Sequence, residues 1–272
     1  MDNESVRLAA MMVYRIASSS DEAAALFAVE CVREALVAMS THASTSSAVR
    51  WVSHAVTLHA VTSRSTNCVK ELFGTVAVRD ALVRLSHQAM TPCAVEAVSL
   101  ALSDLIFCGA AHEELFLSKC VRNGLLSMVV SATTQQSIER LAEAFLNCIF
   151  LSRVKRFLCV RVRDALLAMC ARTTTGECVL QVADTLISFG AVNYPLVSRI
   201  VTTCEVRDAV VMLASRATNS KCAGFVASAF EAVLRADWDT GAPEMFGTSS
   251  VHEALIGLAT RVTEPLDVGS VS

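Results

Sequence analysis

The sequence has none of the short motifs that mark common catalytic and nucleotide-binding sites. HExxH, GxGxxG, GxxxxGK[ST] and GxSxG are absent, and so is any CxxC pair. These strings hold metal ligands, phosphate-binding glycines or nucleophiles in fixed geometries, so the classes that depend on them are excluded. His54 and His59, five residues apart, would lie about 140° apart around a helix and form no ligand pair. We expect a protein that is not an enzyme and that has no cofactor and no metal.

Positive charge and aromatic residues are also scarce. Lys and Arg number 23 against 26 Asp and Glu, which gives a net charge of −3, and aromatic residues make up 6%. Nucleic-acid-binding proteins usually have a basic face, and helical repeats that read bases need a stacking side chain in each unit. A nucleic-acid partner is therefore not expected.

Neither a membrane span nor a secretion signal is predicted. The longest uncharged stretch near the middle, residues 123–138, is half polar and too short to cross a bilayer. The first ten residues are acidic, whereas a signal peptide would begin with basic residues. The 11 cysteines are odd in number and spread through helical segments. We expect them to be reduced and buried in an intracellular protein of the cytoplasm or nucleus.

The sequence does contain a nine-residue motif in six copies: VREALVAMS, VRDALVRLS, VRNGLLSMV, VRDALLAMC, VRDAVVMLA and VHEALIGLA. The copies begin at Val32, Val78, Val121, Val162, Val206 and Val251. Their spacings of 46, 43, 41, 44 and 45 residues are typical of stacked helical repeats. In the second copy Val78, Ala81, Leu82, Leu85 and Ala89 fall on one face of a helix. The Arg and the acid that follow the valine are expected on the opposite, outward face.

A second periodic segment follows 17 residues after each valine. Its anchors are Val49, Val95, Ile138, Val179, Ala223 and Val268. Four residues before the anchors stand Thr45, Thr91, Thr134, Thr175, Asn219 and Glu264. Five of these six are good N-cap residues, and Pro92 follows one of them at the first helical position. The constant spacing predicts two packed helices joined by a tight turn.

All length variation falls between this segment and the next motif. Five of the six linkers carry a phenylalanine five residues before the motif valine, and the sixth carries Val201. The phenylalanines are Phe27, Phe73, Phe116, Phe157 and Phe246. We expect them to be buried between repeats, at the end of a short additional helix such as residues 21–27.

This three-helix unit resembles the armadillo repeat, in which a short first helix precedes a second helix with a V-x-x-A-L-V-x-L pattern. Residues 94–107 and 140–150 are similar to the longer third helix, which has A-L-x-N-L character. The resemblance covers nearly the whole chain and extends to the related HEAT repeat. It implies one all-α domain over residues 1–272, a right-handed superhelix (solenoid) of about six repeats of 41–46 residues. Residues 1–18 and 264–272 would be partial repeats, as in a piece of a longer protein or a module that docks through its ends.

In armadillo proteins the third helices line a concave groove, where nuclear-import members carry a ladder of Trp and Asn. The resemblance assigns the equivalent, partner-binding positions to Arg15, His54, Leu100, Asp104, Glu143, Asn147, Asp184 and Ser188. No position keeps the Trp and only Asn147 keeps the Asn, so import-receptor function is not expected. Asp104, Glu143 and Asp184 would lie on successive layers about 8–10 Å apart, a pitch suited to a basic extended peptide. Ordinary solvated carboxylates are the alternative.

Three functions stay open. The leading one is a non-catalytic protein–protein interaction scaffold that holds a protein or peptide segment, possibly basic, in the groove. The second is a structural segment of a larger assembly that docks through its ends. The third, which the composition disfavours, is a nucleic-acid-binding helical repeat.

Overall fold

The computed structural model describes residues 1–62, 72–107, 114–151, 156–191, 195–236 and 242–262. Every regular element in these ranges is a helix, which confirms the all-α class. The chain divides into two compact units, Met1–Phe157 and Leu158–Ser272.

The repeated motif forms one helix in every copy, called the motif helix below. The motif helices of unit 1 are α3 (Glu30–His42), α6 (Val76–Gln88) and α9 (Lys119–Met128). Those of unit 2 are α11 (Val160–Arg172), α14 (Cys204–Arg216) and α17 (Ser249–Val262). The motif valine is the third residue of each helix. It is buried in every copy except the first, where Val32 is half-buried. The 3.6-residue periodicity thus predicted these helices correctly.

The third helices begin where the N-cap residues predicted. They are α1 (Asn3–Ala17), α4 (Ser46–Thr62), α7 (Pro92–Phe107) and α10 (Gln135–Leu151) in unit 1, and α12 (Gly176–Gly190) and α15 (Ser220–Ala236) in unit 2. From α4 to α15, each starts directly after its predicted cap residue. The sixth cap position, Glu264, and the partial repeat 264–272 lie outside the described residues.

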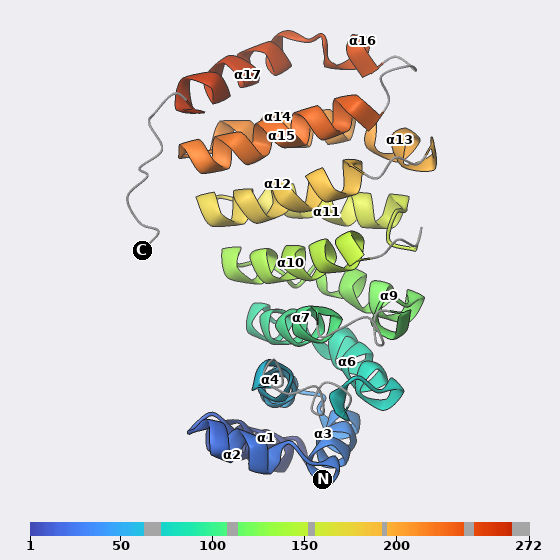
Figure 1. Cartoon of the computed structure of the whole chain (residues 1–272), viewed down its shortest axis with the longest axis vertical. Helices are drawn as coiled ribbons and strands as arrows, with labels where there is room; N and C mark the ends of the chain where they lie inside the picture. Colours follow the sequence, from blue (N-terminus) through green and yellow to red (C-terminus); the bar gives the residue numbers. More distant parts are fainter. Residues whose placement is uncertain (63–71, 108–113, 152–155, 192–194, 237–241, 263–272) are drawn as a thin grey trace. The chain divides into compact units, whose positions relative to one another are not determined.

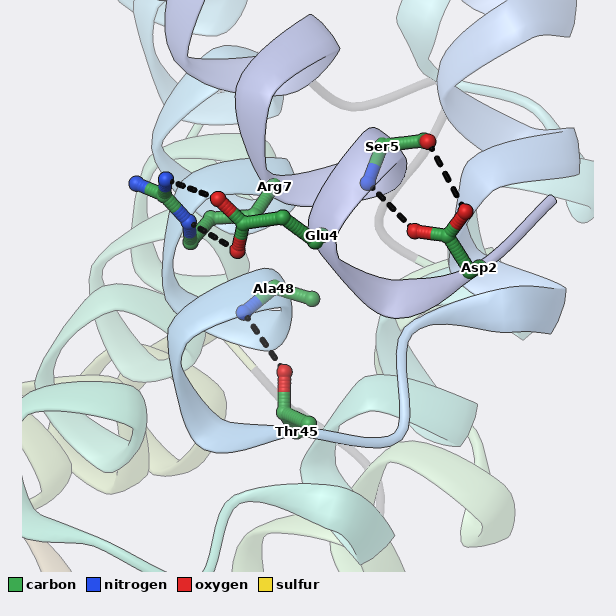
Figure 2. Close-up of polar contacts among 6 residues, drawn as sticks. All are labelled: Asp2, Glu4, Ser5, Arg7, Thr45 and Ala48. Carbon is green, nitrogen blue, oxygen red and sulfur yellow. Dashed lines mark hydrogen bonds and ion pairs between the residues drawn. The ribbon is translucent and has the colours of Figure 1, made fainter.

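Side-chain capping is visible at the N-termini of α1 and α4 (Figure 2). A carboxylate oxygen of Asp2 accepts the backbone N–H of Ser5 at 2.8 Å, and the Thr45 hydroxyl accepts that of Ala48 at 3.3 Å. Glu4 forms an ion pair with Arg7 in the first turn of α1. Asn219 caps α15 in the same way, through the N–H of Cys222 at 2.8 Å. Thr175 holds the N-cap position of α12 without a side-chain cap bond. These bonds satisfy N–H groups that the helix itself leaves open.

Among the elements whose full extent lies in the described residues, short first helices precede three of the motif helices. They are α2 (Asp21–Phe27), α13 (Pro195–Val201) and α16 (Ala242–Phe246). The predicted burial is confirmed for Phe73, Phe116, Phe157, Val201 and Phe246. Phe27 is only half-buried. Helix α3 follows Phe27 in the chain. Among the described helices, α3 packs against one other motif helix, α6, on one side only.

Each unit consists of two layers of helices with the core between them. In unit 1 the third helices α1, α4, α7 and α10 contact one another in succession, and so do α3, α6 and α9 (Figure 1). In unit 2, α12 packs on α15, while α11, α14 and α17 form the motif-helix layer. Leu82, Leu85, Leu102, Ile106 and Phe145 are among the fully buried side chains of unit 1. Every repeat therefore covers an apolar face of its neighbour within the unit.

The motif arginine links successive repeats, which corrects the expectation that it points outward. Arg33, Arg122, Arg163 and Arg207 each donate to a backbone carbonyl of the following repeat, 34 to 39 residues later. The acceptors are Leu72, Arg156, Ile200 and Met245, and each directly precedes the buried Phe or Val201. The side chains of Arg33, Arg163 and Arg207 are only 17–18% exposed. The carboxylate of the next residue forms an ion pair with the guanidinium, as in Arg163–Asp164 at 2.6 Å and Arg207–Asp208 at 2.7 Å.

Candidate partner-binding surface

Six of the eight predicted binding residues lie on the third-helix layer of unit 1. Arg15 on α1 is exposed, whereas His54 on α4, Leu100 on α7, and Glu143 and Asn147 on α10 are half-buried. The sixth, Asp104 on α7, is buried at 8% exposure, so it is not part of an exposed acidic strip. The remaining two, Asp184 and Ser188, are half-buried on α12 and belong to unit 2.

Asn147 makes a contact between two third helices. Its side-chain amide donates to the Ser103 hydroxyl on α7 at 2.6 Å. One amide hydrogen of Asn147 is therefore engaged within the layer, which orients the rest of the side chain.

An acidic cluster lies where α7 and α10 meet. Arg140 pairs with Glu143 at 2.8 Å, and the pKa of Arg140 is raised first by this hydrogen bond and further by the charges of Glu143, Glu139 and Glu96. Three carboxylates around one guanidinium leave a net charge of −2. We call Glu96, Glu139 and Glu143 the acidic cluster. Sequence reasoning found only Glu143; the spacing of Glu139 and Glu143, one turn apart, was the available signal.

A second group of side chains joins α1 and α4. The rings of Tyr14, Trp51 and His54 lie 5.6 to 5.9 Å apart between centroids. The Arg50 guanidinium carbon is 5.5 Å from the centroid of the Trp51 ring, and its Nε donates to Nε2 of His54 at 3.5 Å. We call Tyr14, Arg50, Trp51 and His54 the Arg50 cluster. Of these four residues, sequence reasoning singled out His54 as a binding residue.

The electrostatics of the Arg50 cluster oppose those of the acidic cluster. Burial lowers the pKa of His54, and the Arg50 charge lowers it further, so the imidazole is neutral near pH 7 and accepts the Arg50 hydrogen. Helix α4 contains no Asp or Glu, and the single acid of α1, Glu4, is paired with Arg7. Across the described ranges, no carboxylate lies within ion-pair distance of Arg15 or Arg50.

The two clusters occupy equivalent places in successive repeats. Arg50, Glu96 and Glu139 each stand five residues after the N-cap position of their helix, on α4, α7 and α10 in turn. His54 and Glu143 stand nine residues after it. The charge at one repeat position therefore reverses between α4 and α7.

A pocket lies between α12 and α15 in unit 2. Its volume is about 390 Å³, and Ile187, Gly190, Ser228 and Ala232 are among its lining residues. A Cβ atom at Gly190 would lie 3.3 to 3.4 Å from Ala232 atoms, so the glycine permits the close approach of the two helices. The Glu231–Arg235 pair, 2.6 Å apart, also lines this pocket. On α12, burial raises the pKa of Asp184.

The cysteines correct one further expectation. Cys148, Cys170, Cys178 and Cys222 are buried thiols, but Cys31, Cys93 and Cys204 are exposed. Within the described residues, we find no group of three or more His, Cys, Asp or Glu side chains that could bind a metal ion. None of the described helices has the length and apolar character needed to cross a membrane.

Comparisons with known proteins do not assign this chain to a class. No family model, curated protein or solved structure matches it. The armadillo resemblance therefore depends on the repeat motif and the three-helix unit alone.

Proposed function

We propose that this protein is a non-catalytic interaction scaffold of armadillo-like repeats that binds a segment of a partner protein along its third helices. In this proposal the repeats follow a right-handed superhelix, and the third-helix layer forms its binding groove. The layered packing within each unit and the regular motif spacing support this arrangement.

The observation that carries the proposal is the charge reversal on the third-helix layer of unit 1. Arg50 on α4 gives way to Glu96 on α7 and Glu139 on α10 at the same repeat position. Successive helices stand about 8–10 Å apart, so an extended segment advances about three residues from one to the next. A segment with basic residues near α7 and α10 would complement the acidic cluster.

Binding of a labelled 12-residue peptide of alternating Lys and Gly tests this function by fluorescence anisotropy. We expect Glu96→Gln, Glu139→Gln and Glu143→Gln together to weaken binding at least tenfold and to reduce its salt dependence. The matched control replaces three exposed acids outside the cluster, Glu34, Glu114 and Glu253, with Gln. Equal weakening by both triple variants, or no binding by the wild type, would refute the proposal.

A second candidate function is docking through an end face, and one observation favours it. Leu8, Met12 and Ile16 lie four residues apart on α1 and are 40%, 57% and 43% exposed. This spacing places them on one side of the helix. If this apolar stripe carries the function, Leu8→Glu and Met12→Glu abolish partner binding, whereas the triple Glu→Gln variant leaves it unchanged.

A further inference from the structure

Arg50 differs from seven other described arginines because its guanidinium has a ring, not a carboxylate, as its neighbour. Arg7, Arg33, Arg79, Arg140, Arg163, Arg207 and Arg235 form ion pairs. Arg50 instead lies over Trp51 and uses its Nε toward His54. A guanidinium has five N–H donors, so the two terminal nitrogens of Arg50 keep their donors for a ligand. Such a fork binds a carboxylate through two parallel hydrogen bonds.

The rings beside Arg50 supply a surface for an apolar side chain. Tyr14, Trp51 and His54 are each half-buried, so one part of each ring packs in the layer and another part remains accessible. The tilted arrangement of Tyr14 and Trp51, 5.7 Å between centroids, holds both rings in place. Trp, Tyr and Arg are the residue types that dominate binding energy at protein interfaces. They require little ordering when a partner arrives, because their neighbours already orient them.

The charges around the cluster define the ligand. Arg15 and Arg50 face no carboxylate among the described residues, and α4 has no acidic residue at all. These charges favour an anionic ligand at this place. One helix further on, the equivalent position is Glu96, so the anionic part must be short, about three residues. A polyphosphate chain that continued along the layer would meet the acidic cluster, which disfavours a nucleic acid.

We propose that the Arg50 cluster binds a short acidic segment of a partner protein that carries an aromatic or large aliphatic side chain. A carboxylate of the segment pairs with Arg50, and the apolar side chain covers the exposed edges of Trp51 and Tyr14. This inference rests on the proposed scaffold function and names the partner chemistry at the α1–α4 end of the surface. The complete ligand has an acidic stretch followed, about three to six residues further, by basic residues that reach the acidic cluster.

Selection from a displayed library of random 12-residue peptides tests the inference without assuming a sequence. The wild-type protein is the target, and Arg50→Glu is used for counter-selection. We expect enriched peptides with two or more Asp or Glu next to an aromatic or large aliphatic residue. Enrichment of basic or neutral peptides, or no enrichment over the Arg50→Glu protein, would overturn the proposal.

One enriched peptide, labelled with fluorescein, is then measured against single variants by fluorescence anisotropy. Arg50→Gln and Trp51→Ala should each raise the Kd at least tenfold, while Arg161→Gln, a matched charge change on α11, leaves it unchanged. Circular dichroism melting checks that each variant folds. Because Arg50 is exposed, we expect Arg50→Gln to leave the fold intact.

Two further arms separate the possible explanations. If an oligothymidylate competes with the peptide and depends equally on Arg50, the ligand is a nucleic acid and the inference is wrong. If no acidic peptide depends on Arg50 while the Lys–Gly peptide still depends on the acidic cluster, the inference fails and the scaffold function stands. If neither peptide binds, both proposals fail.

Discussion

The guanidinium of Arg207 on α14 donates a hydrogen bond to the carbonyl oxygen of Met245 on α16, 3.2 Å away and 38 residues later in the chain. Met245 directly precedes Phe246, the buried side chain of the next repeat. The same relationship links Arg163 to Ile200, beside buried Val201. The recurring arginine of the motif thus connects α11 and α14 to the short helix that follows in the next repeat. This contact explains why an arginine follows the valine in the motif. An amphipathic helix alone would need only a polar residue at that position.

Loss of this contact should destabilise unit 2. We expect Arg207→Met, which keeps most of the apolar stem, to lower the free energy of unfolding, because a charge-assisted bond to a backbone carbonyl is lost. Urea unfolding followed by circular dichroism measures the change. The exposed Arg161→Met on α11 is the control and should stay within about 0.5 kcal/mol of the wild type. Similar losses in both variants would show that the contact does not stabilise the stack.

Packing between motif helices α6 and α9 depends on a small residue at Gly124. A Cβ atom there would overlap the Ser86 hydroxyl, which itself donates to the Val83 carbonyl at 2.7 Å. We expect Gly124→Ala to cost about 1–3 kcal/mol of stability through overpacking.

A double-mutant cycle identifies the cause of that loss. In a Ser86→Ala background the overlapping oxygen is absent, and Gly124→Ala should become neutral or stabilise by up to about 1 kcal/mol through its helix propensity. Equal effects of Gly124→Ala in the two backgrounds would contradict this packing account.

Stability should depend on pH through His54. Its pKa in the folded protein is below the ordinary value of 6.5, because burial and Arg50 disfavour the charged form, so the unfolded chain binds its proton at higher pH. The free energy of unfolding therefore falls as the pH decreases from about 7 through 6.5 toward the lowered pKa. Urea unfolding at several pH values should show a shallower fall for His54→Gln than for the wild type. Arg50→Gln, which removes the repulsion from an otherwise intact cluster, should also make the fall shallower; identical slopes in all three proteins would refute this.

Thiol reactivity should separate the cysteines into two groups. Burial raises the pKa of Cys170 to about 12 and that of Cys148 further, and both are inaccessible in the folded protein. Mass spectrometry after brief iodoacetamide treatment should find Cys31, Cys93 and Cys204 modified first. Cys148 and Cys170 should react only at the rate of unfolding, and all five should react equally in denaturant. Early modification of Cys148 or Cys170 would contradict the described packing.

Local signals predicted the helices well. The cap residues Thr45 and Asn219 mark helix starts because a capping hydrogen bond spans only three residues of the sequence. Burial of Phe73 and Phe116 was also predicted, because large aromatic side chains at a fixed place in every repeat have a common apolar environment.

Contacts between repeats could not be predicted in the same way. Whether Arg207 faces solvent or a neighbour depends on where the next repeat places Met245, which periodicity within one helix does not show. The Arg50 cluster needs Tyr14 from another helix, which the pattern within α4 does not show. Asp104 was expected in an exposed strip but is buried; its helix α7 packs against α4 and α10, and the pattern within one helix does not show how much of it those neighbours bury.

The central claim is that a partner segment lies along the third-helix layer, and carboxylate footprinting tests it most directly. Carbodiimide coupling to glycine ethyl ester, read by mass spectrometry, measures the accessibility of each acid with and without the bound Lys–Gly peptide. We predict that the peptide protects Glu96, Glu139 and Glu143 at least threefold and leaves Glu34, Glu114 and Glu253 unchanged. Protection of Glu34, Glu114 or Glu253 in place of the acidic cluster, or no protection at a saturating peptide concentration, would contradict the account.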